Sequence, residues 1–250
     1  MRVSFLVIFC WIGLGLLLYG CWNQETDGTS VTQYSEETGV VDSTQIPIEK
    51  AAICVWSVAG LREEPGRQDR TQNGKNNYIL PIYYGEMVEM LDTPAVEVSA
   101  ENRVYMFVRL KDGQEGWVHE YLFEKNARLA TFIEPAEIYR RPDQMTLKDE
   151  KFEPGEIVAA MERIGDWLHV SGREKKKKGW IKVNNNNQLT MAKKDLKVAL
   201  LYYMAMQENT LEGRLEKLKA ITTDKDLSSS VLIDLVEKEL QASQATSATS

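Results

Sequence analysis

The sequence is poor in the side chains that most often carry acid–base and nucleophilic chemistry at neutral pH. It has two histidines and three cysteines in 250 residues, which leaves few candidates for a general base and excludes a metal site rich in these residues. It has no Gly-rich phosphate loop, no His-x-x-x-His pair and no Gly-x-Ser-x-Gly elbow. We therefore expect no enzymatic activity, no catalytic residue, and neither a metal nor another cofactor.

The sequence also lacks a surplus of positive charge. Thirty basic residues face 37 acidic residues, and the net charge is −7, whereas nucleic-acid-binding proteins usually have a basic surplus. Hydrophobic residues make up 43% of the chain, which is typical of folded domains. The composition therefore favours one or two globular domains with no nucleic-acid partner.

Residues 1–20 read as an export signal, with Arg2 followed by an almost uninterrupted apolar run. The segment Leu18-Tyr19-Gly20-Cys21 resembles the lipobox of bacterial lipoproteins. This resemblance implies cleavage before Cys21, lipidation of that residue and anchoring to a membrane of the bacterial envelope. A plain secretory signal ending near Gly20 and an uncleaved membrane anchor remain alternatives.

The composition of residues 21–50 predicts a flexible acidic tether. Six acidic residues face one lysine between positions 22 and 50, and such a polar segment buries too little apolar surface to offset the entropy of ordering. Cys54, beyond the tether, has no partner for a disulfide once Cys10 is removed and Cys21 is lipidated. It lies in a strand-like run, where a small buried residue is favoured over a reactive thiol.

The middle of the chain repeats a set of short markers in the same order. Each copy has an apolar residue four positions before proline, a Gly-Glu-apolar-Val segment, an aromatic strand and a Gly-Trp-apolar segment. The paired markers are residues 61–65 and 138–142, 85–88 and 155–158, 107–110 and 167–170, and 116–118 and 179–181. The alternating pattern and the turn glycines predict a duplicated small β-barrel.

These ordered markers resemble the bacterial SH3-like (SH3b) domain family. The first copy continues to Tyr121-Leu122, which is similar to the Gly-Trp-Val-x-x-x-Tyr-Leu ending of that family, and the second copy lacks the tyrosine. The resemblance implies two tandem small barrels, residues 51–125 and 129–188, so we expect a mainly β chain that a short helical region follows. It also implies non-catalytic binding of peptidoglycan or another envelope ligand.

By position in the resembled family, Tyr121 is the predicted groove-lining residue, with Tyr83 and Tyr84 as neighbours, because aromatic faces hold extended peptides. That Tyr84 instead covers a face of the sheet is an equal alternative. The strand pattern favours core positions for three tryptophans over ligand contact. It also favours solvated strand positions for the two histidines. These residues are Trp117, Trp167, Trp180, His119 and His169.

A run of basic residues, 173–178, lies between two predicted strands of the second copy. We expect this run either to form an exposed hairpin loop or to contact anionic lipid, glycan or wall polymer. Its lysines are Lys175, Lys176, Lys177 and Lys178.

The apolar spacing becomes helical after residue 190. We expect helices within residues 191–242, one of them restarting at Asn209-Thr210-Leu211-Glu212, and a disordered tail over 243–250. The helices either dock on the second barrel or bind another chain. An envelope scaffold that recruits a protein partner through these helices is therefore the alternative to ligand binding by the barrels.

Overall fold

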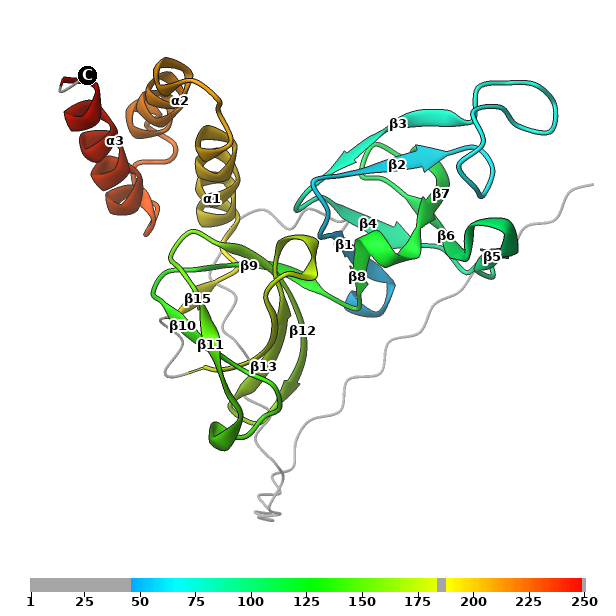
Figure 1. Ribbon diagram of the computed structural model, residues 1–250, viewed down its shortest axis with the longest axis horizontal. Coiled ribbons are helices and arrows are strands. Elements are labelled where there is room, and N and C mark those ends of the chain that lie inside the picture. Colours follow the sequence, from blue (N-terminus) through cyan, green and yellow to red (C-terminus); the bar gives the residue numbers. More distant parts are fainter. Residues whose placement is uncertain (1–45, 184–187, 249–250) are drawn as a thin grey trace, which may run out of the picture. The chain divides into compact units, whose positions relative to one another are not determined.

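The computed structural model describes residues 46–183 and 188–248. All of them belong to one compact unit, Thr44–Ser250. The expected signal, the lipidated Cys21 and most of the tether lie outside the described residues. The described part is mainly β, with two antiparallel sheets followed by three helices (Figure 1), which confirms the predicted fold class at this level.

The first sheet spans residues 51–125 and has eight strands in the order β3-β2-β7-β6-β4-β1-β8, with β5 paired to β6. Its strands are β1 (Ala51–Cys54), β2 (Val58–Arg62), β3 (Tyr78–Tyr83), β4 (Met87–Met90), β5 (Val96–Val98), β6 (Arg103–Arg109), β7 (Glu115–His119) and β8 (Phe123–Lys125).

The second sheet has seven strands in the order β11-β10-β14-β13-β12-β9-β15. Its strands are β9 (Arg128–Phe132), β10 (Ala136–Tyr139), β11 (Leu147–Phe152), β12 (Ile157–Ile164), β13 (Trp167–Ser171), β14 (Lys178–Lys182) and β15 (Leu189–Thr190). If β5 is set aside, this is the strand order of the first sheet, strand for strand. The predicted internal repeat is therefore a repeat of topology.

Short 3₁₀ helices punctuate both sheets, at Ile48–Lys50, Ser99–Glu101, Glu120–Leu122, Gln144–Thr146 and Arg173–Lys175. Each sheet has its own apolar core on one face. The first core includes Leu61, Ile82 and Val118, and the second includes Ile138, Phe152 and Ile181. A smaller cluster, which includes Ile53 and Ala159, joins the two sheets.

The Gly-Glu marker has the same structural role in both copies. Gly85 and Gly155 have φ angles of 83° and 81°, a conformation that glycine adopts without steric cost. Their amides donate to Cys54 O at 2.9 Å and Phe132 O at 2.8 Å. The glutamate that follows each glycine accepts a hydrogen bond from the backbone amide three residues before it, at 3.1 Å for Glu86 and 2.8 Å for Glu156.

One predicted equivalence between the copies is wrong by two residues. Trp117 pairs across the strands with Phe107, and Trp180 pairs with His169, so the equivalent of Phe107 is His169 and not Trp167. A shift of two residues keeps the same side chains on the same face of a strand, so alternation in the sequence could not fix this register.

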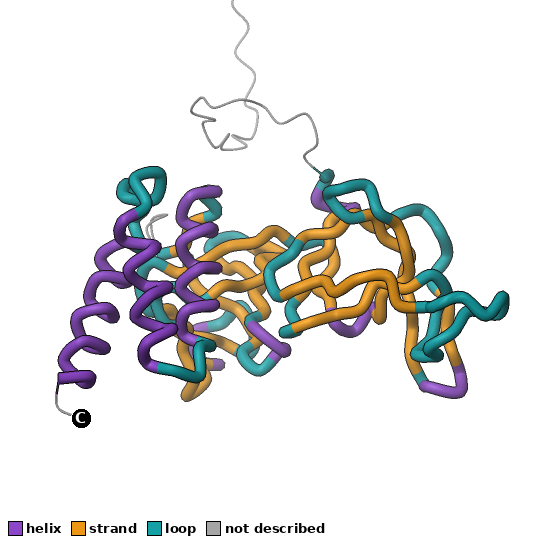
Figure 2. Tube along the Cα trace, turned by 90° about the horizontal axis from the view of Figure 1, so that it is seen from above, coloured by secondary structure: helices purple, strands orange, loops and turns teal. Residues whose placement is uncertain are grey.

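The three helices are α1 (Lys193–Met206), α2 (Leu211–Thr223) and α3 (Ile233–Ala248), and neighbours in the sequence pack side by side (Figure 2). The predicted restart is confirmed, because Thr210 Oγ1 accepts a hydrogen bond from Gly213 N at 3.1 Å and caps α2. The predicted disordered tail is wrong as far as Ala248. Its Ala-rich sequence continues α3, where Ser243 is buried.

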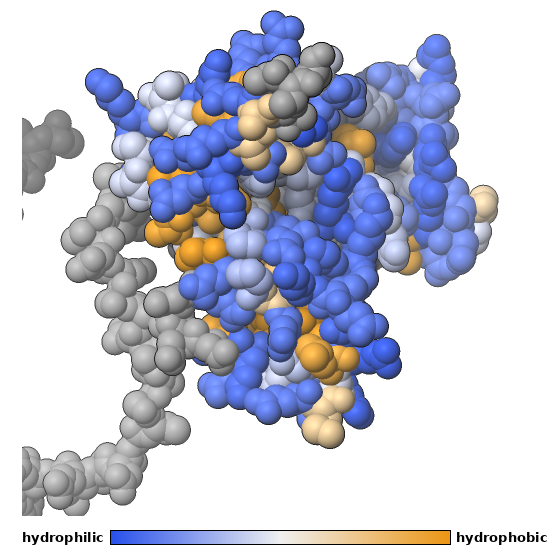
Figure 3. Space-filling view, turned by 60° about the vertical axis from the view of Figure 1, so that its left-hand side comes forward, coloured by the Kyte–Doolittle hydropathy of each residue, from blue (hydrophilic) through white to orange (hydrophobic). Residues whose placement is uncertain are grey.

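The helices dock within the chain. Val198 and Ala199 of α1 share a buried cluster with Ile157 of the second sheet, and Leu129 packs against the same cluster. Polar residues cover most of the face seen in Figure 3, with small separate apolar patches between them. None of the helices in the described ranges is long and apolar enough to cross a membrane.

Candidate functional site

The outward face of the first sheet carries a groove of about 400 Å³. Side chains alternate along a strand, and the groove is lined by outward residues of β2, by the start of β6 and by the end of β7. We call it the Tyr121 groove; its lining is Trp56, Val58, Ala59, Gly60, Arg62, Arg67, Arg103, Tyr105, His119, Tyr121 and Leu122.

Tyr121 forms an aromatic wall of the groove. It lies in the 3₁₀ helix that follows β7, and 55% of its surface is exposed. Its ring centroid is 5.6 Å from that of Trp56 and 6.0 Å from that of His119, with the latter pair stacked. Lys175 Nζ lies 4.7 Å from the same centroid, a distance at which a cation–π interaction is favourable. The ring is thus held in place by its neighbours while more than half of the residue's surface stays exposed.

Gly60 lines the groove and has no side chain. A Cβ placed there would lie 3.2 Å from Cε2 of the Tyr78 ring, which is tighter than normal contact. Glycine at this position therefore lets the Tyr78 ring approach β2 between Val58 and Arg62, the outward neighbours of Gly60.

Three arginines from separate segments reach the groove: Arg62 on β2, Arg67 in the loop after it and Arg103 at the start of β6. Among the described residues, no carboxylate forms an ion pair with any of the three. The groove lining includes no acidic side chain. The groove is therefore aromatic and cationic.

Glu101 lies beside the groove, and both oxygens of its carboxylate already accept hydrogen bonds. It accepts hydrogen bonds from Arg67 N at 2.6 Å and from the Tyr105 hydroxyl at 2.8 Å. Partial burial raises the pKa of its carboxyl, but these hydrogen bonds and the charges of Arg103 and Arg67 outweigh burial and hold that pKa below its ordinary value. Glu101 is thus ionised at neutral pH and orders the lining around it.

His119 lies in the groove, where the sequence pattern favoured a solvated strand residue. Burial lowers the pKa of its imidazole, and the charge of Arg103 lowers it further. The ring is therefore uncharged at neutral pH and contributes an aromatic face. The second histidine, His169, has no equivalent place and stacks on Trp180 at 4.9 Å between ring centroids.

Of the three tyrosines predicted at or near the groove, the structure places one in its lining. Tyr121 lines the groove, and Tyr83 does not, although it is 56% exposed and pairs across the strands with Val58, a lining residue. Tyr84 is 8% exposed, and its hydroxyl donates to Ile157 O of the second sheet at 2.6 Å. Its nomination as a groove neighbour is corrected, because burial between the two sheets and α1 removes it from the surface.

The tryptophans predicted for the core are also corrected. Trp117, Trp167 and Trp180 lie on the outward faces of their sheets, half-buried, and belong to neither core cluster. Trp117 packs on Phe107 at 5.1 Å and Trp167 on Tyr139 at 4.9 Å between ring centroids. Phe107 and Trp117 form an aromatic pair across neighbouring strands, which stabilises a sheet face. Tyr139 on β10 and Trp167 on β13 lie on either side of β14.

The predicted exposed lysine loop is wrong for three of its four lysines. Lys175 and Lys178 form ion pairs with Glu124 of the first sheet, at 3.4 and 2.8 Å, and Lys177 with Glu156 at 2.7 Å. Lys176 is exposed and pairs with Glu174 at 2.7 Å. All four lysines form ion pairs within the chain, three of them with carboxylates that are distant in the sequence and Lys176 with Glu174 of the same loop.

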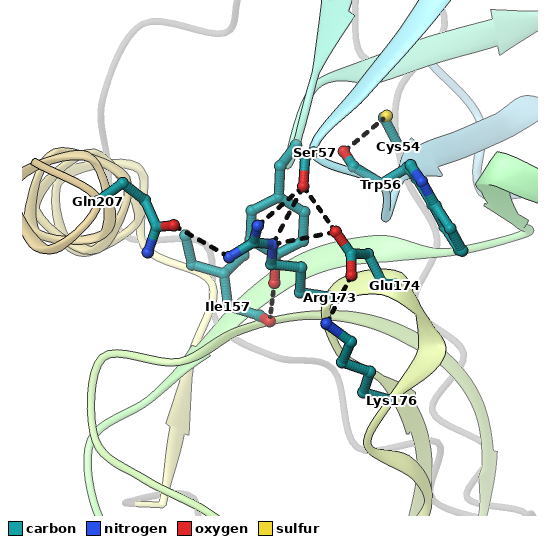
Figure 4. Close-up of polar contacts among 9 residues, drawn as sticks. Cys54, Trp56, Ser57, Ile157, Arg173, Glu174, Lys176 and Gln207 are labelled. Carbon is teal, nitrogen blue, oxygen red and sulfur yellow. Dashed lines mark hydrogen bonds and ion pairs between the residues drawn. The ribbon is translucent and has the colours of Figure 1, made fainter. Parts of the chain in front are cut away.

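Residues 172–178, which we call the junction loop, connect the first sheet, the second sheet and α1 (Figure 4). Arg173 donates to Ser57 Oγ at 2.9 Å and to Gln207 Oε1 at 3.3 Å, and Ser57 donates to Glu174 Oε1 at 2.7 Å. Glu174 N donates to Val55 O at 2.6 Å. Glu174 and Lys175 both have positive φ, and these bonds hold that unusual backbone in place.

Cys54 is fully buried, and its thiol faces two carbonyls that can accept its one proton, Trp56 O at 3.4 Å and Ile82 O at 3.8 Å. Burial raises the pKa of the thiol to about 12, so it is protonated at neutral pH and a weak nucleophile. In the described ranges, no three His, Cys, Asp or Glu side chains come together as a metal site would require.

No protein-family model matches the chain, and no curated protein matches it. Solved structures with partial similarity include NlpC2 from Trichomonas vaginalis (12% identity over 71% of this chain and 57% of that one, TM-score 0.24). NlpC1 from the same organism is 13% identical over 61% of this chain and 48% of its own, with a TM-score of 0.24. An NlpC/P60 family protein from Bacillus cereus is 13% identical over 58% of this chain and 57% of its own, with a TM-score of 0.25.

The chain spans about half the length of these three structures. At such low TM-scores neither their fold nor their activity is carried over to it.

Proposed function

We propose that this chain is a non-catalytic binding protein of the bacterial cell envelope. In this proposal its two β-units are SH3-like barrels, and the first of them binds an extended peptide of peptidoglycan or another envelope ligand in the Tyr121 groove. The observation that carries the proposal is the groove itself, with Trp56, His119 and Tyr121 on one face of the first sheet. Rigid aromatic rings bury a large area at low entropic cost, which suits extended ligands.

The repeated strand order supports a duplicated binding-type unit. Only the first copy has the ending with Tyr121. The second copy contacts the helices and, through its junction loop, the first sheet. We assign ligand binding to the first copy and support of the assembly to the second.

The experiment is retention on purified, insoluble peptidoglycan. We expect the wild-type chain to be retained and Tyr121→Ala to bind about tenfold more weakly, a typical loss for an aromatic contact at the centre of an interface. Tyr83→Ala is the matched control, because Tyr83 is equally exposed and lies outside the groove lining. Equal losses for both variants would contradict binding in the groove, and no retention of the wild type would contradict wall binding.

We also propose that Cys21 carries the membrane anchor. Intact-mass analysis of chain purified from bacterial membranes should show loss of residues 1–20 and added acyl mass. The Cys21→Ser variant should lack the acyl mass and leave the membrane fraction, since lipid chains supply the anchoring free energy. An unmodified Cys21 on a membrane-bound chain would contradict this assignment.

A further inference from the structure

The positive charges of the chain fall into two groups with different surroundings. The lysines of the junction loop are neutralised by Glu124, Glu156 and Glu174. The arginines of the Tyr121 groove form no ion pair among the described residues, although the charges of Arg67 and Arg103 act on the nearby carboxylate of Glu101. The candidate surface for an anionic ligand is therefore the groove and not the lysine run.

The three guanidinium groups come from different parts of the first sheet and share one hollow with Tyr105 and Tyr121. Arg62 makes one long contact, from Nη1 to Gln68 O at 3.4 Å. The nearby carboxylate of Glu101 is already occupied by Arg67 N and the Tyr105 hydroxyl. Arg103 shares a hydrogen bond with the Tyr105 side chain and acts on Glu101 through its charge. A guanidinium group has five N–H donors, so the three arginines retain donors for a ligand.

We infer that the Tyr121 groove selects an extended peptide that carries carboxylates. This inference rests on the proposed function and names the ligand chemistry of the same site. A guanidinium group matches a carboxylate with two parallel hydrogen bonds, and the aromatic wall at Trp56 and Tyr121 covers the peptide between its charges.

The charge balance favours isolated carboxylates over a phosphate polymer. The groove offers three positive charges, with ionised Glu101 beside them, and the whole chain has a net charge of −7. A polyanion many residues long needs more positive charge than three arginines supply, whereas a peptide with one or two carboxylates does not.

The test uses purified peptidoglycan stripped of phosphate polymers and divided into two portions. In one portion the free carboxyl groups are converted to neutral amides by carbodiimide coupling with ammonia. We expect the wild-type chain to bind the untreated portion at least tenfold more tightly than the amidated one, and more tightly at low than at high salt.

The matched variants are a triple Arg62→Gln, Arg67→Gln, Arg103→Gln chain and a control, Arg140→Gln with Arg141→Gln. The control arginines are exposed on the second sheet. The triple variant should bind both portions equally weakly, and the control should behave as wild type. A thermal unfolding curve within about 2 °C of wild type for the triple variant would show that it is folded; if it is not, each single Arg→Gln variant is compared with the control instead.

Equal binding of the wild type to both portions would overturn the carboxylate inference and leave the proposed function intact. Binding only to walls that retain their phosphate polymers would also overturn it, in favour of a phosphate ligand. If the wild type is retained by none of these materials, the proposed function fails and the inference fails with it.

Discussion

The carboxylate of Glu124, on the edge strand β8 of the first sheet, accepts a hydrogen bond of 2.8 Å from Lys178 Nζ, on β14 of the second sheet. Lys175 Nζ lies 3.4 Å from the same oxygen, and the Glu124 side chain is only 9% exposed. One buried carboxylate thus neutralises two lysines that follow each other closely in the sequence. This contact explains why the basic run connects the two sheets and does not form a free cationic surface.

Glu124→Gln should lower the free energy of unfolding by about 1–3 kcal/mol. The substitution leaves two partly buried lysines without their counter-charge, which costs more than loss of a surface ion pair. Urea unfolding at pH 7 measures the change. Glu120→Gln is the control, because Glu120 pairs with Lys125 in a more exposed position, and it should change stability by less than about 1 kcal/mol.

The contribution of Glu124 should depend on pH. Burial raises the pKa of its carboxyl, but the hydrogen bond from Lys178 and the charge of Lys175 outweigh burial, so the folded-state pKa lies below the ordinary 4.5. A lowered folded-state pKa means that the unfolded chain binds the proton more readily. The stabilisation is therefore complete above pH 4.5 and is lost as the pH falls through the folded-state value. The difference between wild type and Glu124→Gln should shrink over that range; a constant difference would contradict this account.

Ser57→Ala should loosen the junction loop. The hydroxyl accepts from Arg173 and donates to Glu174, and its removal leaves both charged groups short of a partner. We expect a loss of about 1–2 kcal/mol in the free energy of unfolding and faster amide hydrogen exchange at Glu174. Ser99→Ala, at an exposed serine, should leave both quantities unchanged.

The repeated Gly-Glu turns should be intolerant of alanine. A Cβ at Gly85 would lie 2.9 Å from Leu200 of α1, and one at Gly155 would lie 2.8 Å from Leu235 of α3. Gly113 also has positive φ but has open space around it. Gly113→Ala should therefore cost only the backbone term of about 1–2 kcal/mol, and the other two substitutions should cost about 1–3 kcal/mol more through overpacking. Equal melting temperatures for the three variants would show that the helices do not pack on these turns.

Cys54 should not react with thiol reagents in the folded chain. The thiol is buried, with its pKa raised to about 12, so both access and ionisation are suppressed. The measurement is the reaction rate with a disulfide reagent at pH 8, in a chain whose Cys10 and Cys21 are replaced by serine. We expect slow reaction that becomes fast in denaturant, and rapid reaction of the folded chain would contradict the burial.

The order of short markers was enough to predict the duplicated β-unit, because turn glycines and strand alternation are local properties of the sequence. The cap at Thr210 was predictable for the same reason. The sequence did not predict which face of the sheet each tryptophan occupies. Trp117 and Trp180 lie in strands whose two faces are both partly covered. Alternation alone does not say which face is the core.

The candidate site was predictable only in part. Tyr121 was nominated through the Gly-Trp-Val segment before it, but Arg62, Arg67 and Arg103 come together only through the pairing of strands distant in the sequence. The same holds for the lysine run. Its partner carboxylates, Glu124 and Glu156, lie far away in the chain, and nothing in the sequence marks a charge as already neutralised.

The most direct test of binding in the Tyr121 groove is a backbone amide NMR titration of the chain with soluble peptidoglycan fragments. We predict that the largest shifts fall on Gly60, Arg62 and Tyr121, and that residues of α1 to α3 stay unchanged. Shifts centred on the helices or on the outward face of the second sheet, with Gly60 and Tyr121 unmoved, would contradict it.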